Sequence, residues 1–577
     1  MLNWILRARA FLARHMKLTD VHRMLLWAVV VGFLGALATI AFRDCIRGLQ
    51  WLLEGRSGSL VAMAKSLPWQ ARLLWPAIGG VIAGATLVVA RHLTTRASSD
   101  YMEAIAIGDG RIPVRFNLLR SLSSLISIVS GGSIGREGSM VQLAATAASV
   151  VGRVTHFDPL RLRLLVACGA AAGITSAYNA PIAGALFVTE IVLGSFAMES
   201  FGPLIVASVV ANITMRQFPG YAPPYQMPPF PVVLGPEMIL FVALGVLAGL
   251  IAPLYLLLLE QSKKQFTKTA WPLPVRLGAG GIIVGAISVW FPDVWGNGFS
   301  VVNSMLHDPW TWNALVMVLL FKIIATAATT GSGAVGGIFT PTLFVGAAIG
   351  TLFGHGVETL ALGTTESLSY TIVGMGAFLA AATGAPLMAI MMIFEMTLSY
   401  DVMLPLMLAS VVAYFVARLV GDRSMYEITV KRSRDANERS RLRDTQMHAL
   451  MKPPETMLPI DAPFSDVTSM FVRFPVKYVY VVDSEDRFLG AIALQDVTAL
   501  LLGEDTSHEA SIEQLMHRDF QVLTADMGLS DALQLFLTHP GERLPVVTSH
   551  DDPKLMGVVY KSVLLDAYVR LSATSLA

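Results

Sequence analysis

The sequence is poor in charge and in cysteine, and each shortage narrows the range of functions. Only 14% of the 577 residues are charged, against about a quarter in soluble domains, and the mean hydropathy is +0.60. The two cysteines, Cys45 and Cys168, lie in apolar surroundings and give neither a disulfide framework nor metal-ligand spacing. The net charge is +1 and no basic stripe is present, so no nucleic-acid partner is expected. No catalytic constellation stands out, so we do not expect an enzyme.

The few charges are unevenly distributed along the chain. Of the 83 charged residues, 39 follow residue 420, which is about one residue in four there and one in ten before it. This break predicts a membrane domain followed by a soluble one. The expected divisions are a basic segment at 1–24, a transmembrane domain at 25–426, a basic linker at 427–450 and two tail domains at 451–505 and 511–572.

Basic residues flank both ends of the apolar region. Arg7, Arg9, Arg14, Lys17 and Arg23 stand at the N-terminal end, and a second basic run extends over 431–443. By the positive-inside rule both ends stay in the cytoplasm, so we expect an even number of crossings. No small-residue cleavage site follows the first apolar run, which argues against a signal peptide. The expected location is the plasma membrane, or the inner membrane of a bacterium.

Several apolar stretches are too short for a simple span of about 20 residues. They are Leu164–Ser176, Ala180–Val192, Tyr370–Ala382 and Pro386–Met396. Gly, Pro and Asn punctuate them. Short segments at corresponding positions of two halves predict broken or re-entrant helices around a binding site near the membrane midplane.

The two halves of this region share a pattern. Ala-Pro at Pro181 is followed nine residues later by Glu190, and Ala-Pro at Pro386 by Glu395, an offset of 205. Gly-rich motifs at 135–139 and 337–341 precede these copies at an offset of 202. We therefore predict an internal repeat. Since the two glutamates occupy equivalent sites, a capping or packing role is favoured for both.

One ionisable pair interrupts the first half, in the motif Gly135-Arg136-Glu137-Gly138-Ser139. A carboxylate at membrane depth is costly unless it faces a polar cavity, which makes Glu137 a functional candidate. The flanking glycines allow a helix to begin here with bare N–H groups, which can hold an anion. A carboxylate at an anion site competes with the anion, as a gate would. The alternative is a buried ion pair with Arg136.

The tail also repeats. Two buried strands are predicted at 479–482 and 544–547, each followed by a second strand, at 489–493 and 556–560. Each pair adjoins an amphipathic helical pattern. We predict two α/β units of about 60 residues.

Together, Gly-Arg-Glu-Gly at 135–138, Gly-Ile-Phe-Thr-Pro at 337–341 and the paired tail resemble the CLC family of chloride channels and proton/chloride exchangers. The likeness is nearest to its bacterial voltage-gated-type chloride channel branch, here with a tail similar to a pair of CBS domains. It covers nearly the whole chain from residue 25. It implies an all-α polytopic membrane protein with two inverted repeats and broken or re-entrant helices, a cytoplasmic α/β CBS pair, and a homodimer with one chloride pathway per subunit.

The resemblance also implies the site residues. Main-chain N–H groups and two hydroxyls would bind chloride, at Ser99, Ile338, Phe339 and Tyr426, and Glu137 would be the gate. Neutral dipoles suit this task because they stabilise a monovalent anion without retaining it. Ser99 as a helix N-cap and Tyr426 as an interfacial aromatic anchor are the alternatives.

The sequence departs from the family pattern at several positions. Ser139 replaces the proline that closes the gating motif. Ile191 stands where exchangers carry an internal glutamate that relays protons, and an isoleucine cannot carry one. We therefore expect a voltage-gated-type chloride channel, with a proton-coupled exchanger using a non-standard internal route as the alternative. A CBS-gated divalent cation transporter and a sensor that moves nothing are the rivals from other classes.

In the tail, the stretch 490–496 matches the family's ribose-binding segment, with Asp496 at the expected carboxylate. Ala493 lacks the usual hydroxyl, and the second copy has Tyr560 and Val563 at the two positions. The pair therefore binds one adenine nucleotide or none, and no other cofactor is expected. A regulatory or dimer-stabilising role for the tail is compatible with either outcome, one bound nucleotide or none.

Overall fold

The computed structural model describes residues 20–55, 58–92, 100–218, 225, 228, 235–363, 365–421, 423–426, 442, 445–502 and 511–573. The chain divides after Val430 into two compact units. Ser99 and most of the expected linker at 427–450 lie outside the described residues.

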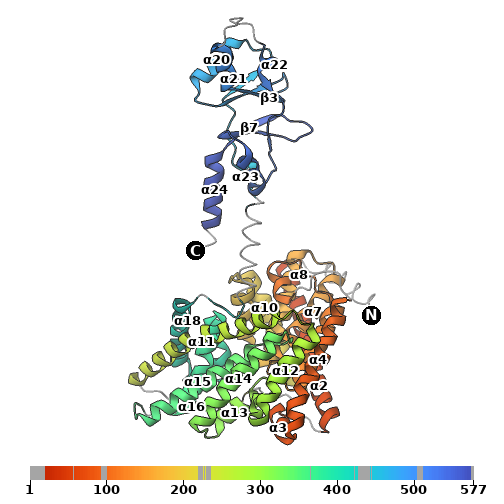
Figure 1. Ribbon diagram of the computed structural model, residues 1–577, viewed down its shortest axis with the longest axis vertical. Helices are drawn as coiled ribbons and strands as arrows, with labels where there is room; N and C mark the ends of the chain where they lie inside the picture. The colour runs from red at the N-terminus through yellow and green to blue at the C-terminus, as the bar shows by residue number, and fades with distance from the viewer. Residues whose placement is uncertain are drawn as a thin grey trace. The chain divides into compact units, whose positions relative to one another are not determined.

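The first unit is helical throughout its described part (Figure 1). Its elements up to the middle of the unit are α2 (Asp20–Glu54), α3 (Leu60–Ser66), α4 (Trp69–His92), α5 (Tyr101–Ala106), α6 (Val114–Val129), α7 (Glu137–Val154), α8 (Pro159–Tyr178), α9 (Pro181–Phe187), the π-helical η1 (Val188–Leu193) and α10 (Met198–Gln217). The others are η2 (Gly235–Glu237), α11 (Met238–Lys268), α12 (Leu273–Trp290), η3 (Pro292–Val294), α13 (Phe299–His307), α14 (Trp312–Ser332), α15 (Phe339–Thr359), α16 (Ser367–Thr383), α17 (Pro386–Thr397) and α18 (Met403–Val420).

Among the described residues, eight helices are long and apolar enough to cross a membrane, and three shorter apolar helices accompany them. The short ones are Pro181–Leu193, Ser367–Thr383 and Pro386–Thr397, as expected from the interrupted runs. The expectation was wrong for Leu164–Ser176, because α8 begins five residues earlier, at Pro159, and spans 20 residues. Asp158 caps its N-terminus and Pro159 occupies the first turn, so the helix carries Arg161 and Arg163 before its apolar part begins.

The short helices α9 and α17 arise from the same local signal. Asn179 ends α8 with φ 58° and Gly384 ends α16 with φ 71°, both in the left-handed conformation that terminates helices. The next two residues are Ala-Pro in each case, and the proline is the first residue of the new helix. Proline suits this position because its fixed φ matches a helix and its missing N–H needs no partner.

Glu190 and Glu395 cap each other's helices. The carboxylate of Glu190 accepts from the N–H groups of Leu387 and Met388, at 3.3 and 2.8 Å. That of Glu395 accepts from Ile182 and Ala183, at 2.9 and 2.8 Å. The end of each helix therefore lies at the start of the other, so α9 and α17 are antiparallel. This confirms the predicted capping role of both glutamates and relates the two repeats by inversion.

Small residues bring the helices of the first unit close together. The helix α4 packs along α12, as α15 does along α16 (Figure 1). A side chain at Gly84 would lie 2.6 Å from Cα of Pro274, and one at Gly80 would collide with the carbonyl oxygen of Leu277. These two glycines therefore allow α4 and α12 to approach closely.

The second unit is an α/β tail with two small sheets. The first has the strand order β1-β2-β3-β4 and the second β5-β6-β7. The strands are β1 (Met457–Pro459), β2 (Tyr478–Val482), β3 (Phe488–Ala493), β4 (Met516–His517), β5 (Leu523–Thr524), β6 (Arg543–Val547) and β7 (Leu555–Tyr560). The helices are η4 (Met447–Ala449), α20 (Phe464–Arg473), α21 (Leu494–Leu502), α22 (Ile512–Leu515), α23 (Leu529–Thr538) and α24 (Lys561–Ala573). The four predicted strands correspond to β2, β3, β6 and β7.

Candidate anion site

Two glycines from opposite halves of the first unit join the starts of two helices. Gly135 and Gly337 exchange main-chain hydrogen bonds of 2.7 and 2.8 Å as an antiparallel bridge. Two residues later begin α7, at Glu137, and α15, at Phe339. Neither N-cap residue, Arg136 or Ile338, gives its helix a side-chain hydrogen bond. Two positive helix-dipole ends therefore meet here without side-chain caps, an arrangement that attracts an anion.

Glu137 is the first residue of α7 and its side chain is only 2% exposed. Its Oε1 accepts a 3.3 Å hydrogen bond from Nδ2 of Asn297, while its buried Oε2 has no hydrogen-bond partner among the described residues. The carboxylate folds back over Gly135, where a Cβ would collide with Oε2. The Glu137 carboxylate therefore lies at a helix N-terminus with one long hydrogen bond and one oxygen that has no partner among the described residues.

Arg136 does not neutralise Glu137 by a direct contact. Among the described residues no ion pair joins them, and the Arg136 guanidinium lies 5.4 Å from the centre of the Phe299 ring. Adjacent residues at a helix start point in different directions. The alternative of a buried ion pair is therefore not supported by the geometry.

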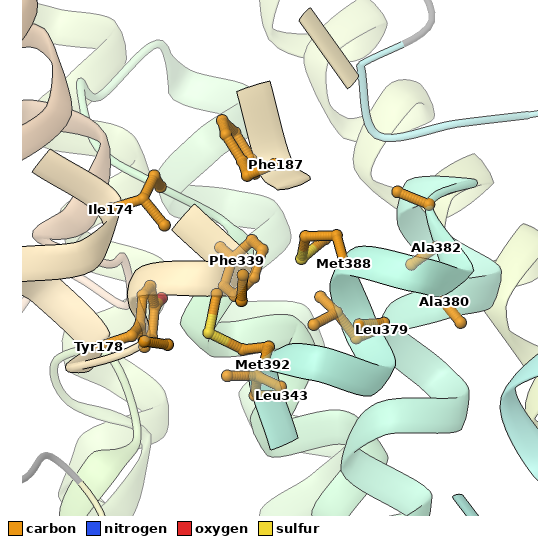
Figure 2. Packing of buried hydrophobic residues seen from close by; sticks show 14 of the residues in the cluster. Ile174, Tyr178, Phe187, Phe339, Leu343, Leu379, Ala380, Ala382, Met388 and Met392 are labelled. Carbon is orange, nitrogen blue, oxygen red and sulfur yellow. The ribbon is translucent and has the colours of Figure 1, made fainter. Parts of the chain in front are cut away.

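Ile338 and Phe339 stand at the start of α15, directly across the glycine bridge from Glu137. Phe339 is 3% exposed, and its ring centre lies 5.0 Å from that of Tyr178 and 6.3 Å from that of Phe187. Figure 2 shows these three rings gathered beside Met388 and Met392 of α17. The Tyr178 hydroxyl shares a 2.7 Å hydrogen bond with Oγ1 of Thr340. Aromatic side chains therefore surround the main chain at this helix start.

Tyr426 reaches the same cluster from beyond the last helix. Its ring lies edge-on to Phe187, with the ring centres 5.7 Å apart. Two bonds attach its segment to the end of α16, since the Met425 N–H donates to the Ala382 carbonyl at 2.9 Å and the Ser424 hydroxyl to that of Thr383 at 2.7 Å. Phe187 thus connects Tyr426 with Phe339.

The start of α5 lies close to Tyr426. Tyr101 is buried in the hydrophobic cluster against which Tyr426 packs, and the Asp100 carboxylate is within electrostatic range of the Tyr426 hydroxyl. Ser99, the remaining predicted ligand, precedes Asp100 but is outside the described residues. Of the predicted site residues, Glu137, Ile338, Phe339 and Tyr426 therefore lie in one region.

Two residues of this region, Asp100 and Asn297, were not predicted from the sequence. The Asp100 carboxylate is within electrostatic range of Tyr426, with its Oδ2 3.6 Å from the Arg120 guanidinium and a buried Oδ1 that accepts no hydrogen bond within the described chain. Asn297 contacts Glu137 from a loop some 160 residues away. The only sequence signal for Asn297 is the Gly296-Asn297-Gly298 stretch, in which both glycines have positive φ.

The comparison with protein families matches residues 87–418 to "Voltage gated chloride channel", and residues 447–503 and 512–570 to the CBS domain. The chain belongs to the CLC family. It is 54% identical to a ClcB-like chloride channel protein of Ralstonia nicotianae, over 71% of this chain and 97% of that protein. It is 41% identical to the voltage-gated ClC-type chloride channel ClcB of Escherichia coli, over 70% of this chain and 98% of that protein.

Solved CLC structures share the fold. A slow cyanobacterial Cl−/H+ antiporter matches with a TM-score of 0.62 and 24% identity, over 74% of this chain and all of that chain. A eukaryotic CLC transporter matches with a TM-score of 0.59 and 19% identity, over 94% of this chain and 97% of that one. The present chain is thus a multi-pass membrane protein of a family of channels and transporters, with a CBS pair in its tail.

The CBS tail offers an incomplete ribose site. Asp496, in the first turn of α21, lies with Oδ2 2.7 Å from Nε2 of His517. Ala493 ends β3 without a hydroxyl. A ribose would have to compete with His517 for the Asp496 carboxylate. With the carboxylate engaged and the hydroxyl missing, these residues fit a ribose poorly.

Among the described residues, no three His, Cys, Asp or Glu side chains gather in a way that could hold a metal ion. Glu190 and Glu395 are bonded to helix N-termini, as described above. Ile191, at the family's internal-glutamate position, is buried in the hydrophobic core of the first unit.

Proposed function

We propose that this CLC protein is a voltage-gated-type channel that conducts chloride across the membrane and is gated by Glu137. Chloride binds where the N-termini of α7 and α15 converge, at the main-chain N–H groups of Ile338 and Phe339 and the hydroxyl of Tyr426. The Ser99 hydroxyl completes this set in the proposal.

The observation that carries the proposal is the Gly135–Gly337 bridge, which holds two uncapped helix starts together around one buried carboxylate. Fixed partial charges stabilise an anion in a medium of low dielectric constant. They do so without a salt bridge that would trap it. The ionised Glu137 occupies the position that an anion would take and leaves it on protonation.

Ile191 favours a channel over an exchanger. Strict exchange requires a protonatable group between the gate and the cytoplasm, and an aliphatic side chain at this position supplies none. The alternative is a proton-coupled chloride exchanger whose protons follow another internal route. Asp100, whose carboxylate is within electrostatic range of Tyr426, is the group that such a route would use.

The protein works as a homodimer in this proposal, with both termini in the cytoplasm. The hydrogen bond between Glu190 and the Leu387 N–H lies at an exposed face of the unit. A charged helix cap exposed to lipid is costly, and a second copy of the chain would cover it. The CBS pair then serves as a regulatory or dimer-stabilising module.

The test is chloride efflux from proteoliposomes with simultaneous proton recording. A channel moves chloride without stoichiometric protons, and its reversal potential is unaffected by a pH gradient at fixed chloride. Glu137→Gln mimics the protonated gate and should make efflux constitutive and independent of pH. Efflux from the Gln variant with the same pH dependence as the native protein would remove Glu137 from the gating role.

A further inference from the structure

A fully buried lysine in α14 lies close to the loop that contacts Glu137. Lys322 has no exposed surface, and its ammonium donates to the carbonyl oxygens of Val294 and Gly296, at 2.8 and 2.7 Å. The Phe344 ring is 5.7 Å from the ammonium. A fully buried ammonium is costly to desolvate, and here its direct hydrogen-bond partners among the described residues are main-chain carbonyls, with the Asp293 carboxylate within electrostatic range. Neither the anion site nor the repeat packing explains it.

The two carbonyls belong to the 292–298 loop, the connection between α12 and α13. Gly296 and Gly298 adopt φ of +67° and +96°, so the loop follows a path that most side chains would oppose. Trp295, between the two carbonyls, is fully buried. Asp293 at its start pairs with Lys65 at 2.9 Å. Lys322 therefore fixes a tightly bent main chain on both sides of Trp295.

Asn297 is the next residue after the second carbonyl that Lys322 binds. Its Oδ1 accepts the Phe299 N–H at the start of α13, at 3.3 Å, and this fixes the orientation of the amide. The Nδ2 group then points to Oε1 of Glu137, also at 3.3 Å. It is the one hydrogen-bond donor to the Glu137 side chain within the described residues.

We infer that Asn297 is a latch that holds the ionised Glu137 in the anion position, and that Lys322 is the positioning residue that keeps this latch in place. The inference rests on the proposed function and adds a residue that sets the pH at which the gate opens. An amide donor stabilises a carboxylate more than a protonated acid, because the charged acceptor forms the stronger hydrogen bond. The latch therefore delays opening until the pH is lower.

Four other polar or charged groups lie within electrostatic range of Glu137. They are Arg136 on its own loop, Tyr178 on α8, Tyr225, and Tyr426 beyond α18. None of these side chains is itself replaced in Asn297→Ala.

The experiment measures the pH midpoint of chloride efflux from proteoliposomes containing the full-length protein. Asn297→Ala should move the midpoint upward by about one pH unit, since a hydrogen bond to a charged group is comparable to one unit of pKa. Asn297→Asp should move it further, because a second carboxylate repels the first. Lys322→Met should shift it in the same direction as Asn297→Ala.

Two controls make the result decisive. The double variant N297A/K322M should shift no further than N297A, because both changes remove one latch, whereas additive shifts would overturn the positioning role of Lys322. Lys65→Gln, which removes the ion pair between an exposed lysine and Asp293 of the same loop but leaves both Lys322 hydrogen bonds in place, should leave the midpoint unchanged. The Asn297 variants change a loop side chain rather than a buried charge. They therefore test the latch even if the Lys322→Met protein does not fold.

Failure of the latch is distinguishable from failure of the proposed function. If Glu137→Gln abolishes pH dependence but Asn297→Ala and Asn297→Asp keep the native midpoint, the latch is wrong and the gate stands. If Glu137→Gln leaves pH dependence intact, both are wrong.

Discussion

Gly135 donates one main-chain hydrogen bond to Gly337 and accepts another from it, which joins the two halves of the membrane unit. This single bridge sets the spacing between the starts of α7 and α15. The hydrogen bonds are 2.7 and 2.8 Å long. Both residues must be small, because Glu137 folds over one side of the bridge and the main chain of Gly138 lies against the other. The bridge thus couples the internal repeat to the candidate gate.

Replacement of Gly135 by Ala should displace the gate. The added Cβ would collide with Oε2 of Glu137 and lie 2.8 Å from the Gly337 carbonyl oxygen. Since the carboxylate is the movable partner, we expect efflux at neutral pH to rise several-fold toward that of Glu137→Gln. Gly138→Ala is the matched control, because its Cβ meets the Gly337 main chain but not the carboxylate. Equal effects of both variants on pH dependence would contradict this reasoning.

Glu190→Gln and Glu395→Gln should each weaken the fold while leaving ion movement intact. A carboxylate accepts two N–H groups here, and an amide can accept only one of them and loses the charge–dipole attraction. Each variant should cost about 1–3 kcal/mol of stability, measured by thermal or denaturant unfolding in detergent. Chloride and proton recording on the same samples tests whether ion movement stays intact. Loss of a native proton flux in Glu190→Gln alone would assign Glu190 a relay role.

Asp100→Asn should increase chloride conduction. The carboxylate lies close enough to Tyr426 to interact with it electrostatically, and a negative charge at that place repels an anion. An effect of about 1 kcal/mol corresponds to a roughly five-fold change in efflux at low salt, reduced by screening at high salt. Arg120→Gln removes the cation paired with Asp100 and should act in the opposite direction. A decrease in efflux for both variants would point to a structural role for the pair.

The CBS tail should lose stability as the pH falls below about 6.5, the ordinary histidine value. Burial of the His539 ring, with Lys561 nearby, lowers its pKa. The unfolded chain then binds a proton that the folded tail does not, so the stability present above the ordinary pKa is lost as the pH falls through this range. Hydrogen exchange of the tail, corrected for intrinsic rates, should show weaker protection at pH 5.5 than at pH 7.5. His539→Phe keeps a ring beside Tyr478 and Phe520 and should reduce that difference.

Much of the fold could be predicted from the sequence, because its signals are local. The Ala-Pro steps at Pro181 and Pro386 mark the start of new helices, and their offset of 205 residues reveals the repeat. The alternation of strands in the tail is equally local. The start of α8 was missed because the apolar pattern begins only after Arg163, whereas the cap that starts the helix is Asp158.

The candidate site could be predicted only in part. Glu137, Ile338 and Phe339 belong to short motifs at helix starts. Such a motif can be recognised in the sequence without knowledge of distant contacts. Asn297 contacts Glu137, which lies 160 positions away in the chain, and Lys322 contacts two carbonyls that lie 26 and 28 positions away. No local pattern in the sequence encodes contacts over such distances. Asp100 was not predicted as a site residue, because its relevance depends on its electrostatic interaction with Tyr426, which lies more than 300 residues later in the chain.

The most direct test of the account is anomalous diffraction from crystals of the Glu137→Gln protein soaked in bromide. The account predicts a bromide peak at the start of α15, within hydrogen-bond distance of the Phe339 N–H and the Tyr426 hydroxyl. Bromide peaks elsewhere in the crystal, with none beside Phe339 and Tyr426, would contradict it.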